Sequence, residues 1–386
     1  DSKWVSGLIV AGNVLDRMHW GSQDADSEAH HGNLSLFDGG EIRGFRVGDV
    51  GTINFEKPWV YTLFGATNSI DKGFEVQNQE DFTMFDARLD IPIFEKTNVS
   101  IGNQKEPISL ERLMPMTNIA MQERTSVSDA FLPSRNFGVV MSGNALGERM
   151  SWAGGVFNDF IDKDVSFDDG AMTVAGRVTW LPFITTDESN LVHLGLGASR
   201  SDGNSGFHYR AEPEFNKAPL FVDTGFGDAD GIDQLDLEAS WRRGPFWFAA
   251  EHVETFVDSP TDGELDFSGS YLTAAWIVTG EMREYQVGSG TFGPVPISRS
   301  AYQNGPGAWA IAARWSGIDL DAGPLSGGEM DILSLGVSGW LSTAFNINLN
   351  YRYIFNDRVV FDDEASALAL DGEASGLVLR LLLKLQ

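Results

Sequence analysis

The last eleven residues of the chain, GLVLRLLLKLQ (376–386), restrict its fold more than any other stretch. Leucine occupies every odd position from 377 to 385, while the even positions include Arg380 and Lys384. Side chains of a β-strand alternate between two faces, so this strand carries one purely apolar face and one face with cations. Such a strand fits a boundary between lipid and a water-filled interior. A shift of one residue would place both cations in hydrocarbon, at about 2–4 kcal/mol each near the midplane, so the pattern also fixes the register.

The same alternation recurs along most of the chain. In 345–355, for example, every odd residue is apolar or aromatic, and the even ones include three Asn and Arg352. Alternation is weaker around 53–66, 245–257 and 267–279, where the facing of the side chains is open. We expect strands near 4–15, 41–49, 53–66, 80–91, 97–104, 137–145, 149–157, 171–181, 190–199, 232–242, 245–257, 267–279, 307–319, 330–341, 345–356 and 374–386.

A soluble β-sandwich also alternates, with its polar faces in water. Three features favour a membrane barrel instead. The runs exceed the usual five or six residues and suit tilted spanning strands, and short connections alternate with long polar ones. Aromatic residues also mark strand ends, as in interfacial girdles. We therefore expect an all-β fold, a transmembrane antiparallel β-barrel of about 16 strands formed by residues 1–386 as one domain. The girdle candidates are Trp4, Trp20, Trp59, Trp180, Trp241, Trp309, Trp340, Tyr353 and Phe355.

Composition and motifs exclude several other classes of protein. The chain has no Cys, which excludes disulfide scaffolds and thiolate metal sites, and its net charge of -28 argues against nucleic acid as a partner. No run approaches the ~18 apolar residues of a transmembrane helix. The sequence has no nucleophile elbow, HExxH or P-loop motif, and none of its six His lies in a recognisable catalytic motif. We therefore expect that the protein is not an enzyme.

Most of the negative charge is concentrated in five polar segments, 21–40, 158–169, 223–233, 258–266 and 357–373. They hold 23 acidic residues and only two basic ones, so they carry about -21 of the -28. We expect them to form extracellular loops. Because the Debye length is about 10 Å at 0.1 M salt, these acids would be largely screened from the middle of the membrane.

Two interpretations of the acidic loops stay open. They are either a solvated surface that resists aggregation, or ligands for Ca²⁺ or Mg²⁺ that bridge subunits or lipopolysaccharide, since carboxylate oxygens suit hard cations. None of them has the spacing of a known Ca²⁺ loop. No other cofactor is expected. The candidate metal ligands are Asp24, Asp26, Glu28, Asp168, Asp169, Asp362, Asp363 and Glu364.

Residues 105–136 form a different kind of connection, too long for a turn and amphipathic rather than acidic. Helical spacing brings Leu110, Leu113 and Met114 together. Its four cations are balanced by four carboxylates. A long structured segment after the fifth strand of such a wide barrel is expected to fold inward and narrow the aqueous lumen.

The residues of this segment resemble the phosphate-selective porin O and P family of Gram-negative outer membranes. The similar series begins at KEP (105–107), continues through SLERL (109–113) and ER (123–124), and ends with Phe131, Pro133, Arg135 and Gly138. A second similar stretch starts at TGE (279–281) and includes Arg283, Tyr285, Gly290, Phe292, Gly293 and Pro294. The likeness runs from about residue 4 to the end of the chain.

This resemblance implies an outer-membrane porin, in which small hydrophilic solutes and ions diffuse passively through a water-filled channel narrowed by the inner segment. It implies a homotrimer among outer-membrane lipids and lipopolysaccharide, and passage of anions such as phosphate along Arg and Lys side chains. Gln386 stands where the family usually ends on an aromatic residue. Either barrel assembly tolerates this residue, or the natural chain continues beyond it.

The resemblance also proposes residues for the ion pathway. The arginine-rich second strand of the family falls on 42–46, where Arg43 and Arg46 match but Gly44 replaces an Arg that phosphate-specific members often carry. Asp86 corresponds to a carboxylate of the fourth strand, and Lys105 to the start of the inward loop. The pathway candidates are completed by Arg88, Arg112, Arg124 and Arg135, and alternation adds Arg314, Arg352, Arg380 and Lys384 as lumen-wall cations.

The selectivity stays open between three outcomes: weak anion preference, weak cation preference and a specific phosphate site. At short range, local rings of charge decide it. Many of these cations would simply pair with carboxylates, above all Arg112 and Arg124, each of which has a Glu beside it in sequence. A further alternative is an abundant surface-array barrel whose acidic loops form a coat bridged by divalent cations.

Overall fold

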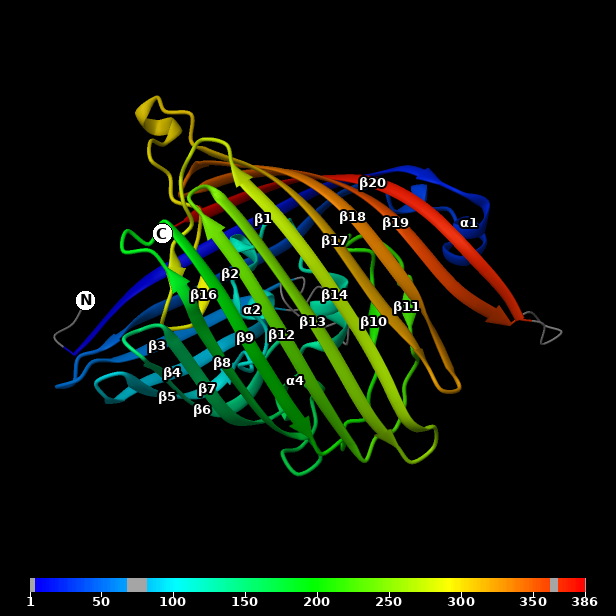
Figure 1. Cartoon of the computed structure of the whole chain (residues 1–386), viewed down its shortest axis with the longest axis horizontal. Helices are drawn as coiled ribbons and strands as arrows, with labels where there is room; N and C mark the ends of the chain where they lie inside the picture. Colours follow the sequence, from blue (N-terminus) through cyan, green and yellow to red (C-terminus); the bar gives the residue numbers. More distant parts are fainter. Residues whose placement is uncertain (1–3, 68–81, 362–366, 386) are drawn as a thin grey trace.

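A computed structural model describes residues 4–67, 82–361 and 367–385 of the chain. Over these residues sixteen strands form one closed barrel, in which every pair of neighbours is antiparallel and the last strand closes on the first (Figure 1). The predicted fold is confirmed. The strands are β1 (Val5–Gln23), β2 (Gly39–Ile53), β3 (Trp59–Ala66), β4 (Thr83–Phe94), β5 (Thr97–Gln104), β6 (Asn136–Ala145), β7 (Met150–Asn158), β8 (Met172–Ile184), β9 (Asn190–Ser201), β12 (Gly231–Arg243), β13 (Phe246–Ser259), β14 (Gly263–Ile277), β17 (Ala308–Ala322), β18 (Leu325–Ser342), β19 (Phe345–Phe361) and β20 (Ala367–Leu385).

The connections carry short elements, and two of these are small separate sheets formed by β10 with β11 and by β15 with β16. None of the helices in the described residues is long and apolar enough to cross a membrane. The elements are α1 (Ala25–His31), η1 (Leu34–Phe37), α2 (Leu110–Leu113), η2 (Met116–Asn118), α3 (Ser126–Phe131), α4 (Phe160–Lys163), β10 (Arg210–Ala211), β11 (Val222–Asp223), β15 (Tyr285–Gln286), β16 (Thr291–Phe292) and η3 (Ala301–Gln303).

The alternate leucines of β20 point outward and its arginine points inward, as the sequence predicts. Four of its five alternate leucines are at least 38% exposed on the outer surface, whereas Arg380 is buried on the inner face. Arg380 lies directly opposite Asp16 of β1 and donates to both carboxylate oxygens, at 2.8 and 2.6 Å. The polar face of the last strand is therefore satisfied by the first strand, which closes the barrel.

A β-bulge in β2 places two arginines on the same face although they are three residues apart. In the pairing of β1 with β2, Val14 lies opposite Gly44 and Leu15 opposite Ile42, so Arg43 is the extra residue. A bulge reverses the alternation beyond it. Ile42 and Phe45 are consequently exposed on the outside, while Arg43 and Arg46 both turn inward.

The two rims of the barrel differ. We call the end at which β1, β5 and β9 finish the long-loop rim, and the opposite end, where β2, β6 and β12 finish, the short-turn rim. At the short-turn rim, short turns follow β6, β12 and β18, as the predicted alternation of short and long connections requires. This rim also carries one long connection, residues 278–307 between β14 and β17, whose entry into the barrel was not predicted (Figure 1).

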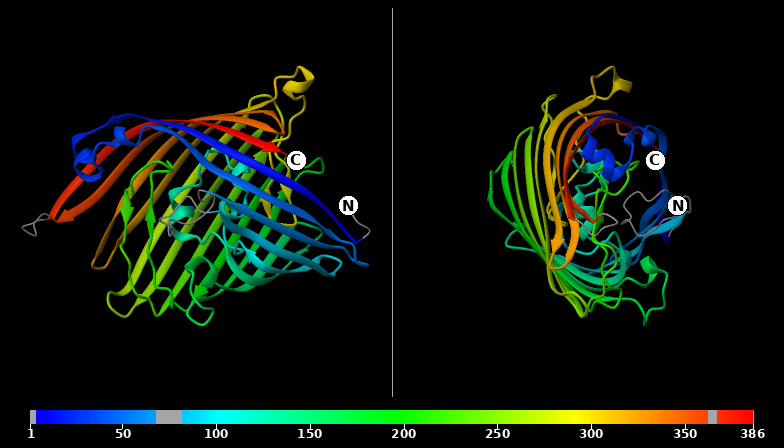
Figure 2. Two further views of the ribbon diagram at one scale, coloured as in Figure 1. Left: turned by 180° about the vertical axis from the view of Figure 1, so that it is seen from behind. Right: turned by 90° about the vertical axis from the view of Figure 1, so that its right-hand side faces the viewer.

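Three predictions about the acidic loops are wrong. Residues 258–266 are a tight turn rather than a long loop, because Ser259 Oγ accepts from the backbone N–H of Asp262 at 3.1 Å and Gly263 adopts a φ of 85°. Most of 357–373 is strand, since only five residues separate β19 from β20. The segment around 223–233 does not extend outward, because residues 202–230 return into the barrel (Figure 2).

The aromatic girdle is also confirmed only in part. Trp180, Trp241 and Phe355 are exposed on the outer surface as expected. Trp20 and Trp340 are buried instead, and Trp20 packs against Phe215 with a ring-centroid distance of 5.0 Å. Trp340 falls on the same face as Ser334 and Ser338 in the alternating pattern, so its burial follows from the sequence. The burial of Trp20 is explained only by its contact with the returning segment.

Leu335 offers a direct test of the lipid-facing surface. It is 61% exposed and lies among the outward leucines and valines of β18. We expect Leu335→Arg to lower the free energy of unfolding in lipid vesicles by about 2–4 kcal/mol, because a cation there must enter hydrocarbon. Leu36→Arg, at an exposed position of η1, serves as the control and should change it little. Equal effects of both changes would contradict this orientation.

Candidate channel constriction

Three connections fill the barrel, and we name them by position. The inner loop (105–135) and the second inner segment (202–230) enter from the long-loop rim (Figure 2). The rim insertion (278–307) starts at the short-turn rim; its part with β15 and β16 lies inside the barrel, whereas η3 projects beyond the rim (Figure 1). The sequence predicted only the inner loop. Buried aromatic residues of the second inner segment, including Phe215 and Phe221, were the available signal, since an exposed loop has little reason to carry them.

The inner loop owes its shape to two capped helical turns. Ser109 caps α2 by accepting from the backbone N–H of Arg112 at 3.0 Å, and Thr125 caps α3 by accepting from that of Ser128 at 3.2 Å. Glu111 joins the two turns, because one of its oxygens accepts from the N–H and hydroxyl of Thr125 and from the hydroxyl of Ser128. The predicted helical turn around Leu110 and Leu113 is present.

The wall makes room for the inner loop at glycines. A Cβ on Gly269 would lie 2.8 Å from Val127, and one on Gly197 would lie 3.0 Å from Ile108. Both distances are tighter than ordinary side-chain contacts. The strands β9 and β14 therefore accept loop side chains directly against their backbone.

Glu123 fixes the tip of the inner loop to two wall arginines. Arg43 donates to both of its oxygens, at 2.9 and 3.1 Å, and Arg380 donates to one of them. Burial disfavours the charged carboxylate, but Arg380 and Arg43 outweigh this and lower the pKa of Glu123 to about 2. Two of the predicted pore cations thus hold the loop in place.

A second cluster joins Arg46, Asp86 and Arg135. Arg135 donates to Asp86 at 2.9 Å, and Arg46 forms an ion pair with the other oxygen of the same carboxylate. Arg46 also lies over the ring of Phe64, 4.3 Å from its centroid. Two arginines share one carboxylate, so this cluster retains a net positive charge.

Three other cations predicted for the pathway stabilise the inner loop itself. Lys105 donates to the carbonyl oxygens of Arg112 and Met114, at 2.6 and 3.2 Å. Arg112 donates to the carbonyls of Leu132 and Pro133, at 2.6 and 2.9 Å, and pairs with Asp129 at 3.3 Å. Arg124 donates to the carbonyl of Met114 at 2.8 Å. Arg112 and Arg124 are buried and Lys105 is half-buried, and the hydrogen bonds of all three stabilise the backbone of the loop.

The lumen-wall cations Arg314 and Arg352 meet a carboxylate that sequence reasoning missed. Glu214 of the second inner segment forms an ion pair with Arg314 and lies 3.6 Å from Arg352 Nε. It also accepts from Ser316 Oγ at 2.6 Å. Arg352 lies over Phe215, 4.6 Å from the ring centroid. No spacing along the chain connects residue 214 with β17 and β19, so only the fold reveals this cluster.

The rim insertion is held on the opposite wall by Arg177 of β8. This arginine donates to both oxygens of Glu238, at 2.5 and 2.7 Å, and to the carbonyls of Ser289 and Gly290, at 2.8 and 2.9 Å. Arg283 of the insertion reaches the carbonyl of Asn118 in the inner loop. The insertion and the inner loop therefore support one another inside the barrel.

Two cavities remain between these segments, and we name them by their charge. The cationic chamber, about 300 Å³, lies between inner-loop residues 115–122 and strands β1, β2, β3, β18, β19 and β20. Its titratable lining residues are Arg46, Arg380 and Lys384, without a carboxylate. The acidic chamber, about 170 Å³, lies between inner-loop residues 129–134, the second inner segment and α4. Its charged and titratable lining residues are Glu106, Asp129, Asp159, Asp162, Lys163, His208 and Arg210.

The remaining predicted residues lie outside both chambers. Arg88 pairs with Asp90 at 3.1 Å on β4. Asp24 caps α1 and accepts from two backbone N–H groups, at 2.8 and 3.0 Å, which gives it a structural role. Asp26, Glu28, Asp168 and Asp169 are exposed, and a divalent cation bound by them stays a prediction. Asp362, Asp363 and Glu364 lie outside the described residues.

The acidic chamber is expected to respond to pH. Burial raises the pKa of Glu106 to about 7 and that of Asp129 to about 6, although Asn136 and Arg112 respectively oppose the shift. As the pH rises from 5.5 to 8 the chamber gains negative charge, so the single-channel reversal potential should move toward cations. Both folded pKa values exceed the unfolded ones, so stability should be highest below about pH 4.5 and fall until about pH 7. Glu106→Gln should reduce both changes, and an unaltered pH dependence would contradict the assignment.

Comparison with known proteins agrees with this architecture. The model of the family described as phosphate-selective porin O and P matches residues 13–382. An uncharacterized protein of Caulobacter vibrioides is 27% identical over 248 residues, which are 60% of this chain and 48% of that protein, so the match spans about half the length of this relative.

Solved structures share the fold at low sequence identity. OmpT of Vibrio cholerae has a TM-score of 0.59 at 10% identity, with 100% of this chain and 99% of that chain covered. The outer-membrane channel DcaP of Acinetobacter baumannii has a TM-score of 0.57 at 6% identity, with 100% and 99% covered. OmpF of Salmonella typhi, in complex with daunomycin, has a TM-score of 0.51 at 11% identity, with 98% and 97% covered.

Proposed function

The chain belongs to the phosphate-selective porin O and P family and is a protein of the bacterial outer membrane, and from this premise we propose that it forms a channel for small hydrophilic solutes with a preference for anions. A closed barrel of sixteen strands is wide enough to enclose an aqueous passage. The three inward segments then set the size and charge of the passage. The sequence contains no recognisable catalytic motif, which also favours a channel over an enzyme.

The cationic chamber is the single observation that carries the anion preference. All of its titratable lining groups are cations, and Lys384 has no carboxylate partner within the described part of the chain. In a narrow site with low-dielectric walls, local charge of one sign raises the concentration of counter-ions. Small anions, phosphate among them, are therefore the solutes that the chamber favours over cations.

Gly44 limits the expected strength of this preference. Its place on the inner face of β2 leaves two arginines where phosphate-specific members often carry three, and Arg43 is committed to Glu123. Arg46 is likewise shared with Asp86. We therefore propose a moderate anion preference rather than tight phosphate binding.

The decisive measurement is the reversal potential of single channels in a planar bilayer under a KCl gradient, with and without phosphate. We expect the wild type to lie on the anion side and to be blocked partly by phosphate. The double variant Arg46→Gln/Lys384→Gln should move the potential toward zero or beyond, because it removes two of the three charges of the chamber. Lys96→Gln, a change at a half-exposed rim position paired with Glu148, is the control and should leave the potential unchanged. A wild-type potential on the cation side would contradict the proposal.

We further propose a homotrimer whose apolar outer surface contacts lipid and whose acidic loops meet lipopolysaccharide. One of the similar structures, OmpT of Vibrio cholerae, has been solved in a trimer form, with a TM-score of 0.55. The outer surface of this barrel carries an apolar hollow of about 510 Å³ across β13, β14 and β17 to β20, which can accept apolar chains. The molecular mass of the detergent-solubilised protein, measured by light scattering, tests the trimer.

A further inference from the structure

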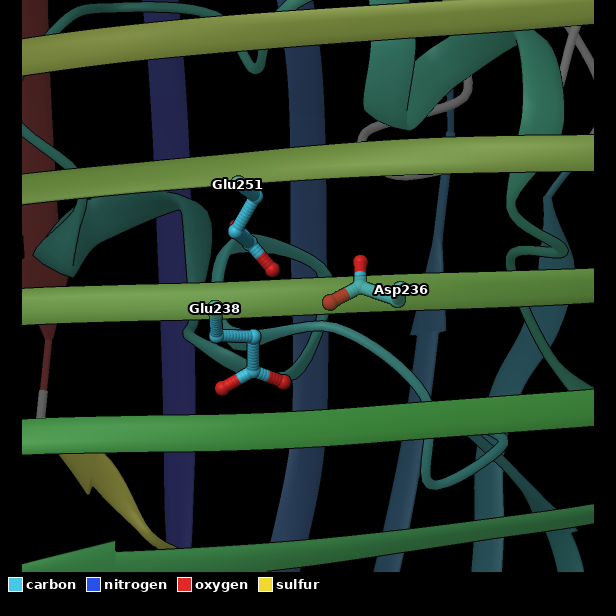
Figure 3. Close-up of side chains that lie close together, drawn as sticks. All are labelled: Asp236, Glu238 and Glu251. Atoms are coloured by element: carbon cyan, nitrogen blue, oxygen red, sulfur yellow. The ribbon is translucent and has the colours of Figure 1, made fainter.

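Three carboxylates are gathered inside the wall, and none of them lines either chamber. Asp236 and Glu238 stand two residues apart on the inner face of β12, and Glu251 of β13 lies directly opposite Glu238. One oxygen from each of the three lies within 4.8 Å of the other two. Figure 3 shows the carboxyl groups of Asp236 and Glu251 turned toward one another, whereas the carboxyl group of the neighbouring Glu238 points away from them. Like charges that face one another across two strands destabilise a sheet unless something compensates them.

Two of the three carboxyl groups accept several hydrogen bonds. Glu238 receives two hydrogen bonds from Arg177 and has His193 Nε2 at 3.0 Å. Glu251 accepts from the backbone N–H groups of Leu110 and Glu111, at 2.6 and 2.8 Å, and from the hydroxyl of Tyr271. For Glu238, the charge-assisted hydrogen bonds from Arg177 favour the carboxylate form.

Asp236 is the group that the protein leaves unsatisfied. It is 0% exposed, and neither of its oxygens accepts a hydrogen bond from any described residue. A buried polar group without a partner is rare and costly, and a buried unpaired charge costs more. The neighbouring cation, Arg177, compensates only one of the three carboxylates. The geometry therefore has a missing positive partner at the point where the three carboxylates meet.

We propose that these three carboxylates bind one hard divalent cation of the Ca²⁺ or Mg²⁺ class. Carboxylate oxygens are the ligands that such ions prefer, and a 2+ charge supplies the compensation that the site lacks. Glu238 and Glu251 keep free lone pairs on their oxygens beside the hydrogen bonds they accept. The cation is distinct from any bound by the exposed loops, because its ligands come from the barrel wall.

A cation at this site would also fix the attachment of the inner loop to the wall. Glu251 holds the start of α2 through the N–H groups of Leu110 and Glu111, so the ion that orders Glu251 also orders the attachment of the loop. Binding of a cation to the folded state alone would stabilise that state by mass action. The site would thus lock the base of the loop to β12 and β13 without lying in the path of permeating ions.

Terbium luminescence tests the site, because Tb³⁺ replaces Ca²⁺ at oxygen sites and is excited through nearby tyrosine, here Tyr271. In the detergent-folded full chain we expect a Ca²⁺-competed emission whose decay in H₂O and D₂O shows few coordinated waters, as a buried site requires. Asp236→Asn should weaken the binding of the ion by about 10–100-fold or more, because even the loss of a residue that only orients a metal ligand weakens binding to that extent. The control is Asp233→Asn, an exposed position of the same strand, and it should keep the emission.

Other outcomes overturn the proposal. Emission only from highly hydrated Tb³⁺, equal in wild type and Asp236→Asn, would mean that only surface carboxylates bind the ion. If Asp236→Asn fails to fold, the wild type alone still decides: its thermal unfolding should shift upward in Ca²⁺ relative to EDTA. No shift would mean that no cation binds there, and that Asp236 and Glu251 share a proton instead. The anion preference of the channel would stand in either case, because it depends on other residues.

Discussion

Glu123→Gln is expected to release the inner loop from the wall and to cost about 3–5 kcal/mol, the range for removing one partner of a buried ion pair. Glu123 pairs with Arg43, and it shares Arg380 with Asp16. The substitution removes the negative charge that Glu123 shares between the buried guanidinium groups of Arg43 and Arg380. Because the loop can leave the wall while the barrel stays closed, we expect a larger and noisier single-channel conductance.

The same interaction predicts an effect of acid. The pKa of Glu123 is lowered to about 2, so its contribution to stability is present above the unfolded pKa near 4.3 and is lost as the pH falls through about 2. Wild-type channels should therefore become noisy only in strong acid. Glu148→Gln is the matched control, because its pair with Lys96 is exposed and such pairs contribute about 0–1 kcal/mol. Quiet channels of normal conductance in Glu123→Gln would contradict the proposed anchor.

Glu214→Gln is expected to have an effect of similar size on the second inner segment. Arg314 keeps Glu111 as a partner at 3.3 Å, but Arg352 loses its one carboxylate among the described ion pairs. None of the three guanidinium nitrogens of Arg352 has a hydrogen-bond partner in the described residues. The loss of Glu214 thus leaves a buried charge without compensation, at about 3–5 kcal/mol.

A second substitution separates this mechanism from general damage. Replacing both partners of a buried ion pair by uncharged residues is often nearly neutral. Glu214→Gln/Arg352→Met should therefore be more stable in urea unfolding than Glu214→Gln alone. Glu212→Gln in the same segment serves as the control: loss of hydration raises the pKa of Glu212 well above its usual range, so it resembles the neutral amide. A double variant as unstable as the single one would contradict the assignment.

The barrel itself could be predicted because alternation is a local property of the sequence. Each strand between lipid and lumen must place apolar side chains on one face, and β20 shows this pattern without interruption. The inner loop could be located by its length and amphipathic pattern, and resemblance supplied Arg43, Arg46 and Asp86. These three residues do lie in the interior, beside the inner loop.

The partners of the cations could not be predicted, because they come from distant parts of the chain. Glu123 reaches Arg43 across 80 positions, and Glu214 reaches Arg314 across 100. The bulge at Arg43 is also decided by pairing with β1, not by the residues around it. Cations that are equivalent in the sequence therefore differ in the structure, so that Lys384 lines a cavity while Lys105 binds backbone carbonyls.

The sequence by itself determined which face of most strands meets lipid and therefore the barrel, because the cost of a charge in hydrocarbon acts on every residue separately. Only the tertiary structure decided which cations remain available to an anion, because that depends on the carboxylates that three inward connections bring to the wall. The residue type fixes the charge of a side chain, whereas the side chains packed around it decide whether that charge is paired. For the same reason the unsatisfied Asp236 becomes visible only when β12 and β13 are paired.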